Sequence, residues 1–205
     1  PTIRSRCRHL SLRTPSTKAI IKLLIERDSI DLATAEFVAK ASGGHIGRAR
    51  RLATDTNAKE NRKNIMKLPF TIKDIASAFK AAQYLVEAAK ADALADSEAK
   101  DELEISKLKE AWGASGSKLA AGGSKAVKEL EKEQKSRSTR MVRDYLDRAL
   151  LDLSTLYRDV LLVQSGSNDS LINEDLKSEI SKLAATESPP RTLKKIEAIL
   201  KTRSY

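Results

Sequence analysis

The segment 142–163, with the sequence VRDYLDRALLDLSTLYRDVLLV, decides the fold class. Its apolar residues recur every three or four positions, which is the spacing of one face of an α-helix. They are Val142, Tyr145, Ala149, Leu153, Leu156, Val160 and Val163. Neither glycine nor proline occurs between Ser124 and Ser165, and if this element is helical throughout it is roughly 60 Å long at ~1.5 Å per residue. Its first half is mostly charged, and we expect that half to project beyond a bundle or to fray.

Four further helices are expected around this one. The first begins with Thr71 and Asp74 in the form of a capping box and runs to about Ala95. Its apolar face consists of Ile72, Ile75, Phe79, Ala82, Val86 and Ala89. Helices are also expected over about 97–112, 174–185 and from Pro190, the last with Ser188 as its cap, and a glycine-rich link follows residue 112. Residues 69–205 are therefore predicted to form a five-helix bundle.

Three shorter helices are expected before that bundle. Thr14 as N-cap and Pro15 at the first helical position open the first helix. Asp31 caps the second, which Gly43 and Gly44 end through the left-handed conformation that glycine allows. The third covers about 45–55. The residues expected to face inward include Ile20, Leu24, Leu32, Ala35, Val38, Ala39, Ile46, Ala49, Leu52 and Ala53. Leu68-Pro69 is expected to break the chain, which places a domain boundary between 14–68 and 69–205.

The positive charge of the chain is concentrated near its start. Residues 1–68 hold 15 Lys and Arg against 6 Asp and Glu, whereas residues 69–205 hold 23 against 22. An anionic partner is therefore expected at the first third. The single cysteine excludes an internal disulfide and a thiolate zinc site within these residues. No signal peptide or long apolar run occurs, so a cytoplasmic location away from membranes is expected.

The first residues predict a different structure from the rest. In Thr2–Leu12, Arg4, Arg6 and Arg8 alternate with other side chains, as they do on one face of a strand. A single strand leaves its backbone donors and acceptors unpaired, which is costly. We therefore expect residues 1–13 to be an orphan strand, the end of a core domain that precedes Pro1 in a longer protein.

Three segments carry a resemblance to a known family. They are Thr2–His9 with its Ser5-Arg6-Cys7 triplet, Gly44–Leu52 (GHIGRARRL) and Lys128–Arg140 (KELEKEQKSRSTR). In this order they resemble the delta-prime subunits of bacterial DNA polymerase III clamp loaders, which belong to the AAA+ superfamily, in their actinobacterial form. The resemblance implies an all-α fragment, with a three-helix AAA+ lid over 14–68 and a collar bundle over 69–205, preceded by the strand from the AAA+ core.

The resemblance also implies roles for residues of the first segment. Arg6 would act in trans as an arginine finger on the ATP of a neighbouring subunit, since a planar, permanently charged guanidinium stabilises charge on transferring phosphoryl oxygens. Ser5 and Cys7 would be framework residues, and Arg4 and Arg8 would share the interface. On an unrelated protein, an arginine in this position would be a solubilising charge on an edge strand.

The second segment departs from the pattern of ATP-binding relatives. Aligning Gly44 and Ala49 with that pattern puts Gly47 at the sensor-arginine position, with Arg48 one residue late. No phosphate-binding loop or nucleophile–base pair occurs either. We therefore expect no nucleotide, metal or catalytic site in this chain, with ATP and Mg²⁺ bound by neighbouring subunits. Arg48, Arg50 and Arg51 either contact phosphate or DNA backbone or form a solvated helix face. For Lys135–Arg140 with Arg143, the solvated face is favoured.

The function implied is that of a clamp-loader subunit that supplies Arg6 and collar contacts to a ring. Its partners would be the tau/gamma and delta subunits and, through the complex, the sliding clamp and primer-template DNA. The alternative is a free-standing basic helical nucleic-acid-binding domain that uses residues 1–68, for which DNA affinity would depend steeply on salt. An enzyme is disfavoured because the sequence has no residues at catalytic spacing.

Overall fold

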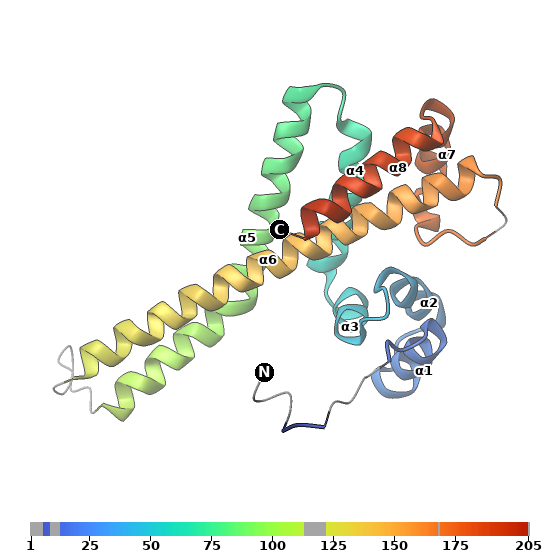
Figure 1. Cartoon of the computed structure of the whole chain (residues 1–205). Helices are drawn as coiled ribbons and strands as arrows, with labels where there is room; N and C mark the ends of the chain where they lie inside the picture. Colours follow the sequence, from blue (N-terminus) through green and yellow to red (C-terminus); the bar gives the residue numbers. More distant parts are fainter. Residues whose placement is uncertain (1–5, 9–12, 113–121, 168, 205) are drawn as a thin grey trace. The chain divides into compact units, whose positions relative to one another are not determined.

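The computed structural model describes residues 6–8, 13–112, 122–167 and 169–204. All regular secondary structure in these ranges is helical (Figure 1), as the sequence predicts. The chain divides into two compact units, one of residues 1–61 with 168–177 and one of residues 62–167 with 178–205. This division falls between Asn61 and Arg62, earlier than the boundary expected at residues 68–69. The roles of lid and collar stay predictions.

The first unit contains α1 (Thr17–Asp28), α2 (Leu32–Ala41) and α3 (Ile46–Thr54), as the sequence predicts. The N-cap of α1 is Ser16, whose hydroxyl accepts from the Ala19 N–H at 3.2 Å, so the expected start at Thr14-Pro15 is wrong. Asp31 caps α2 as expected, accepting from the Thr34 N–H at 2.9 Å. After α2 the chain turns through Gly43 (φ 60°) and Gly44 (φ 88°), also as expected.

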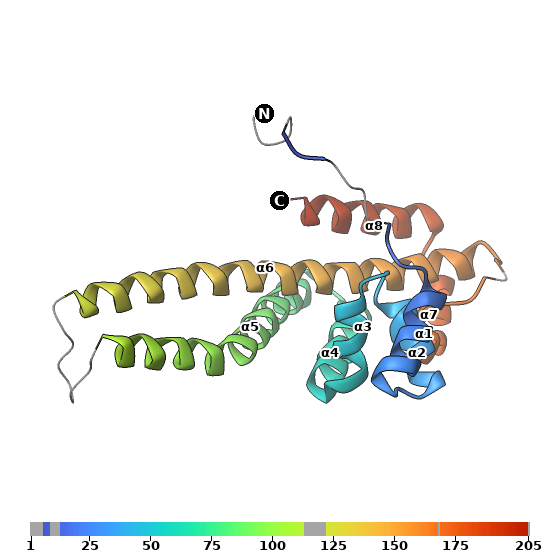
Figure 2. The ribbon, with the colours of Figure 1, turned by 90° about the horizontal axis from the view of Figure 1, so that it is seen from below.

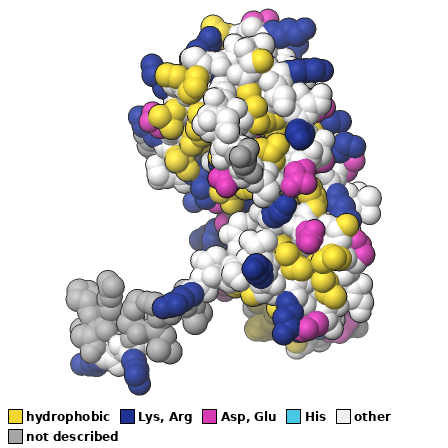
Figure 3. All heavy atoms as spheres, turned by 90° about the vertical axis from the view of Figure 1, so that its right-hand side faces the viewer, with side chains coloured by type: hydrophobic (Ala, Val, Ile, Leu, Met, Phe, Trp, Pro, Cys, Tyr) yellow, Lys and Arg dark blue, Asp and Glu magenta, His cyan; other side chains and the backbone are white. Residues whose placement is uncertain are grey.

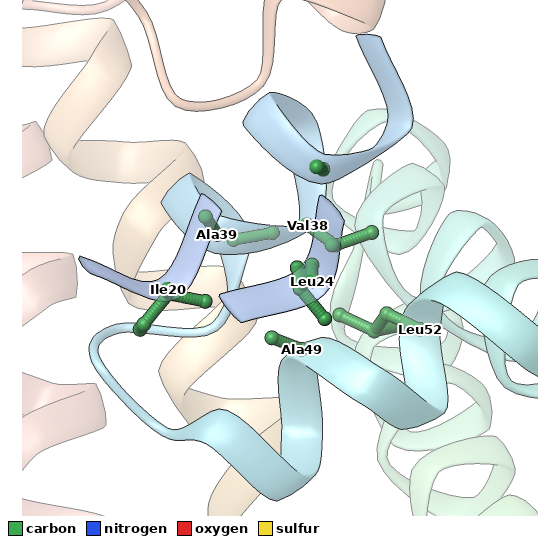
Figure 4. Packing of buried hydrophobic residues seen from close by; sticks show 8 residues of the cluster. Ile20, Leu24, Val38, Ala39, Ala49 and Leu52 are labelled. Atoms are coloured by element: carbon green, nitrogen blue, oxygen red, sulfur yellow. The ribbon is translucent and has the colours of Figure 1, made fainter. Parts of the chain in front are cut away.

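The apolar core of this unit lies between its three helices, as Figure 4 shows. Small and medium side chains fill it: Ile20, Leu24, Ala35, Val38, Ala39, Ala41, Ala49 and Leu52. Leu32 was expected to join them, but it lies at the start of α2 and is 58% exposed. The core thus follows the predicted helical faces except at that helix end.

Helix α4 (Thr56–Thr71) runs through the stretch where a break was expected. Pro69 lies in the last turn of α4, so the helix loses a backbone hydrogen bond only just before it ends. Thr71 closes this helix and does not begin the next one. The capping box of α5 is formed instead by Asp74 and Ser77. Asp74 Oδ1 accepts from the Ser77 N–H at 2.7 Å, and Ser77 Oγ accepts from the Asp74 N–H at 3.0 Å.

Helix α5 (Ile75–Ala111) is continuous where two helices were expected to meet near residues 95–97. Ser97, the expected start of the second helix, is buried, and its hydroxyl donates to the Leu94 carbonyl at 3.4 Å within the helix. Helix α6 (Gly123–Gln164) is one uninterrupted helix of 42 residues, which settles the continuity that the sequence leaves open. The second half of α5 runs beside the first half of α6 (Figure 2). We call this pair of half-helices the arm.

The chain ends in a short 3₁₀ turn, η1 (Glu174–Leu176), followed by α7 (Lys177–Thr186) and α8 (Pro189–Arg203). These positions agree with the prediction. Ser188 is the N-cap of α8, although its side chain makes no capping hydrogen bond. Helix α8 packs along α6, as α5 does, while α5 and α8 make no extensive contact with each other.

The core of the second unit is built on the apolar half of α6. Ala149, Leu153, Leu156 and Val160 of the predicted stripe are buried, whereas Val163 is 36% exposed. Ile65 of α4, Leu85 of α5 and Ile199 of α8 pack around Ala149 and Leu153. Because three helices from distant parts of the sequence meet on α6, this helix organises the unit.

A buried ion pair joins α4 to α6. Arg62 Nε donates to Asp152 Oδ1 at 3.1 Å, and each side chain is only 6% exposed. Removing one partner of such a pair leaves an uncompensated charge in a site that water cannot reach, which is strongly destabilising. The pair therefore fixes the place where α4 crosses α6.

Arg62→Met is expected to lower the free energy of unfolding by about 3–5 kcal/mol, because Asp152 is left buried without its partner. The double variant Arg62→Met/Asp152→Leu should recover most of this loss, since neither residue then carries a charge. The measurement is urea unfolding followed by circular dichroism. Lys22→Met is the control: it breaks the exposed pair with Glu26, worth less than about 1 kcal/mol. A double variant as unstable as the single one would contradict the assignment.

Candidate functional site

The predicted arginine finger lies in an exposed turn. Arg6, Cys7 and Arg8 are described, and they form a turn and a bend with all three residues exposed. Ser5, Arg4 and most of the predicted strand lie outside the described residues. The described part of the predicted strand is therefore a turn and not extended. Exposure leaves the Arg6 guanidinium accessible to a partner, and its trans role stays a prediction.

The arginines of α3 are largely engaged within the first unit. Arg50 forms a two-pronged pair with Asp28, with Nε to Oδ2 at 2.6 Å and Nη2 to Oδ1 at 2.7 Å. This carboxylate raises the pKa of Arg50. Arg51 pairs with Asp55 at 3.4 Å, and the backbone N–H of Arg48 donates to His45 Nδ1 at 3.3 Å. Two of the three predicted phosphate contacts are therefore structural ion pairs.

One arginine of the basic run of α6 is held by the facing part of α5. Arg137 donates to Glu104 through Nη2 at 2.6 Å and Nη1 at 3.2 Å, and it also pairs with Asp101. Gln134 Nε2 donates to the Asp101 carbonyl at 2.9 Å. The hydrogen bond from Arg137 lowers the pKa of Glu104. Lys135, Arg140 and Arg143 are exposed, in line with the expected solvated face, and Arg137 is the exception. The partners come from α5, a pairing that sequence spacing alone does not reveal.

An apolar stripe on α5 is exposed, contrary to expectation. Of the residues predicted to face inward, Ile72, Ile75, Phe79 and Val86 are 43%, 76%, 73% and 36% exposed, and only Ala89 is buried. The buried face of α5 consists instead of Ala81, Ala89, Ala93 and Ser97. The spacing of three and four residues correctly identifies an apolar face of a helix. The same spacing is found whether that face packs on the core or on a partner protein, so it does not predict burial.

A groove lies beside this stripe in the second unit. It has a volume of about 770 Å³. Its lining includes Leu68, Pro69 and Phe70 from the end of α4, Ile72 from the link to α5, Ala78, Ala81, Ala82 and Leu85 from α5, Leu153 and Tyr157 from α6, and Lys182, Leu183, Lys195, Ala198 and Ile199 from α7 and α8. A large apolar hollow next to exposed apolar side chains is a candidate binding surface.

One wall of the groove is polar. Lys195 of α8 pairs with Glu187 and lies 5.1 Å from the centre of the Tyr157 ring. Burial, together with the charge of Glu187, raises the pKa of Tyr157 to about 12. The phenol therefore stays neutral at physiological pH and serves as an apolar floor with one polar atom.

The part of the chain that the structure describes contains no group of three or more His, Cys, Asp or Glu placed to hold a metal ion. Among the same residues, no helix combines the length and apolar character that crossing a membrane requires. Lys and Arg side chains on the face drawn in Figure 3 are interspersed with acidic and apolar ones and form no continuous basic patch.

Comparison with known proteins finds a family model that matches part of the chain. Residues 142–205 match the family model described as DNA polymerase III, delta subunit, C terminal. This stretch covers the apolar half of α6 together with α7 and α8. No curated protein and no solved structure matches the chain.

The Arg137 cluster predicts a pH dependence. Because the pKa of Glu104 is lowered in the folded state, its pairing stabilises the protein fully above its ordinary value of 4.5 and is lost as the pH falls through the folded-state value. Glu104→Gln should therefore unfold at lower urea concentration than the wild type at pH 7, and this difference should vanish in acid. Glu102→Gln, an exposed neighbour on α5, should show little difference at either pH. A difference for Glu104→Gln that persists unchanged in acid would contradict the pairing.

Proposed function

We propose that this chain is a subunit of a bacterial replicative clamp loader, of the delta-prime kind, that binds no ATP of its own. The observation that carries the proposal is the match of residues 142–205 to the C-terminal model of the DNA polymerase III delta subunit. The triplet Ser5-Arg6-Cys7 and the segment Gly44–Leu52 add to it, because they resemble delta-prime subunits at the other end of the chain. In this proposal residues 69–205 are a collar that holds the subunit in a ring with tau/gamma and delta.

The exposed stripe of α5 supports a role in assembly. Ile75 and Phe79 present large apolar side chains to solvent at successive turns, which is costly for a surface that stays uncovered. A neighbouring subunit that covers this stripe would bury it and stabilise the ring. The ring would then open the sliding clamp and load it onto primer-template DNA, using ATP and Mg²⁺ held by the neighbours.

The free-standing nucleic-acid-binding domain is the weaker candidate. It rests on the basic charge of residues 1–68, but Arg50 and Arg51 are paired with Asp28 and Asp55. Pairing lowers the charge available to phosphates and the number of counterions that binding would release. A steep salt dependence of DNA affinity for the isolated chain would reverse this preference.

Arg6→Ala should leave ring assembly intact and lower the rate of DNA- and clamp-stimulated ATP hydrolysis. An arginine finger acting in trans is worth about 10³–10⁵ in rate in well-studied GTPases, but a ring with several ATP sites would show less, since only the site facing Arg6 loses it. Arg6→Lys should rescue poorly because an ammonium lacks the planar fork. The assay is ATP hydrolysis by reconstituted rings checked by gel filtration. Unchanged hydrolysis in an intact ring would reduce Arg6 to a surface charge.

Tight ATP binding by the isolated chain in calorimetry would also contradict the proposal.

Phe79→Asp should weaken assembly with tau/gamma and delta without unfolding the chain. Phe79 is 73% exposed, so its replacement should change stability by less than about 0.5 kcal/mol. A charge buried in an interface should cost tenfold or more in affinity, that is, about 1.4 kcal/mol. Leu103→Asp, at an exposed leucine further along α5, is the matched control. Equal assembly by the Phe79 variant and the wild type would remove this stripe from the ring interface.

A further inference from the structure

The groove of the second unit stays open where small side chains border it. Helices α5 and α8 each pack on α6 but make no extensive contact with each other. Along the groove they present alanines, Ala78, Ala81 and Ala82 on α5 and Ala198 on α8. Because alanine cannot reach across the space, these side chains do not close the groove. Its volume of about 770 Å³ lies in the range of sites that bind small molecules.

Two polar atoms of the groove lining lack a hydrogen-bond partner. Tyr157 is 8% exposed, and its hydroxyl makes no hydrogen bond with any residue that the structure describes. The pKa of Tyr157, raised to about 12 by burial and by the charge of Glu187, keeps this hydroxyl protonated and able to donate at physiological pH. Glu187 pairs with Lys195 through Oε1, but its Oε2 is buried without a hydrogen-bond partner among the described residues. Buried polar atoms are nearly always hydrogen-bonded, because an unpaired one is costly.

These two atoms belong to one polar cluster, whose charges are balanced. The ammonium of Lys195 joins the cluster, since it pairs with Glu187 and lies 5.1 Å from the centre of the Tyr157 ring. The other charged side chains that line the groove are Lys182 and Glu179. Two cations therefore meet two carboxylates in the described lining. A charged ligand would gain no net attraction for the hydration that it loses, so an uncharged ligand is favoured.

The part of the lining that comes from α4 and α5 is apolar. Its side chains include Leu68, Phe70 and Leu85 together with the alanines of α5. A ligand that matches the whole groove therefore has an apolar body and one polar end. An extended peptide matches it less well, because a peptide carries an amide at every residue. Amides that face the apolar wall would lose water and find no partner.

We propose that the groove binds an uncharged, mainly apolar small molecule whose polar end is a carboxamide, or a group that likewise both accepts and donates a hydrogen bond. The oxygen of this group accepts from the Tyr157 hydroxyl, and its N–H donates to Glu187 Oε2. The apolar body lies against Leu153 and the alanines. This proposal does not depend on the proposed function, because it rests on the groove alone.

The test titrates the 205-residue chain with three compounds of the same shape and follows binding in two-dimensional amide NMR spectra. The amide 3-phenylpropanamide accepts and donates, the ketone 4-phenylbutan-2-one only accepts, and 3-phenylpropanoate is an anion. We expect the amide to bind with a Kd of about 5 mM or tighter, as its size allows. It should shift the signals of groove residues such as Ala81 and Ala198. We expect it to bind about threefold tighter than the ketone and about tenfold tighter than the anion.

Conservative variants assign the two hydrogen bonds. Tyr157→Phe removes a hydroxyl that has no partner among the described residues, so the chain should stay folded while the amide binds about fivefold more weakly. Tyr84→Phe, on α5 outside the lining, is the matched control and should change nothing. Glu187→Gln should remove the repulsion of 3-phenylpropanoate and strengthen its binding about tenfold. Glu197→Gln, exposed on α8 outside the lining, should not.

A blocking variant locates the site. Ala198→Trp fills the groove from an exposed position and should weaken the amide about tenfold or more. Ala76→Trp, at an exposed position of α5 outside the lining, should bind the amide as the wild type does.

Four results would overturn the proposal. The first three are the absence of saturable shifts at groove residues, amide binding no tighter than that of the ketone or the anion, and unchanged amide binding by Tyr157→Phe. The fourth uses acetyl-trileucinamide as a peptide probe: binding at the same residues more than tenfold tighter than that of the amide would make the groove a peptide site. Ring assembly is not part of these measurements. Failure here leaves the clamp-loader proposal standing, and failure of the Arg6 and Phe79 experiments leaves this one standing.

Discussion

Burial of the apolar half of α6 is the constraint on which the second unit depends. Leu153, Leu156 and Val160 cannot be covered by one neighbour, so α4, α5 and α8 approach this helix from different sides. The pair of Arg62 and Asp152 fixes one of these approaches, since a buried charge tolerates only the geometry that neutralises it. The groove follows from the same arrangement, because two helices that share a third need not meet each other.

Local sequence predicts the helices of this protein well and their boundaries unevenly. The helix that carries the 142–163 stripe and the cap at Asp31 follow from residue type and spacing, and the structure has both. Pro69 and Ser97 mislead because each is tolerated inside a helix, one in a last turn and the other with its hydroxyl bonded to the backbone. The period of the Ile75–Val86 stripe identifies an apolar face, but it does not distinguish a core from a surface that awaits a partner.

The candidate sites depend on long-range pairing, which spacing does not reveal. Arg50 has the sequence context of a phosphate contact, yet Asp28 on another helix holds it. The residues that line the groove come from all the helices between α4 and α8, so no single stretch of sequence predicts the groove. By contrast, the proposed family relationship rests on local sequence at both ends of the chain, on Ser5-Arg6-Cys7 and on residues 142–205. The sequence therefore supports the proposed kind of complex, and the structure identifies the surfaces that a partner could contact.

Helix α6 joins two kinds of side-chain contact, one in the arm and one in the core of the second unit. Toward the start of α6, contacts with α5 are made by groups such as Arg137 and Gln134, whereas the later part of the same helix is buried by aliphatic side chains. Charged contacts weaken with ionic strength, and apolar burial does not. Backbone amides of the arm should therefore exchange with deuterium through local opening, and salt should accelerate this exchange. Amides around Leu156 should exchange only when the whole unit unfolds. A single continuous helix can in this way belong to two cooperative units of different stability.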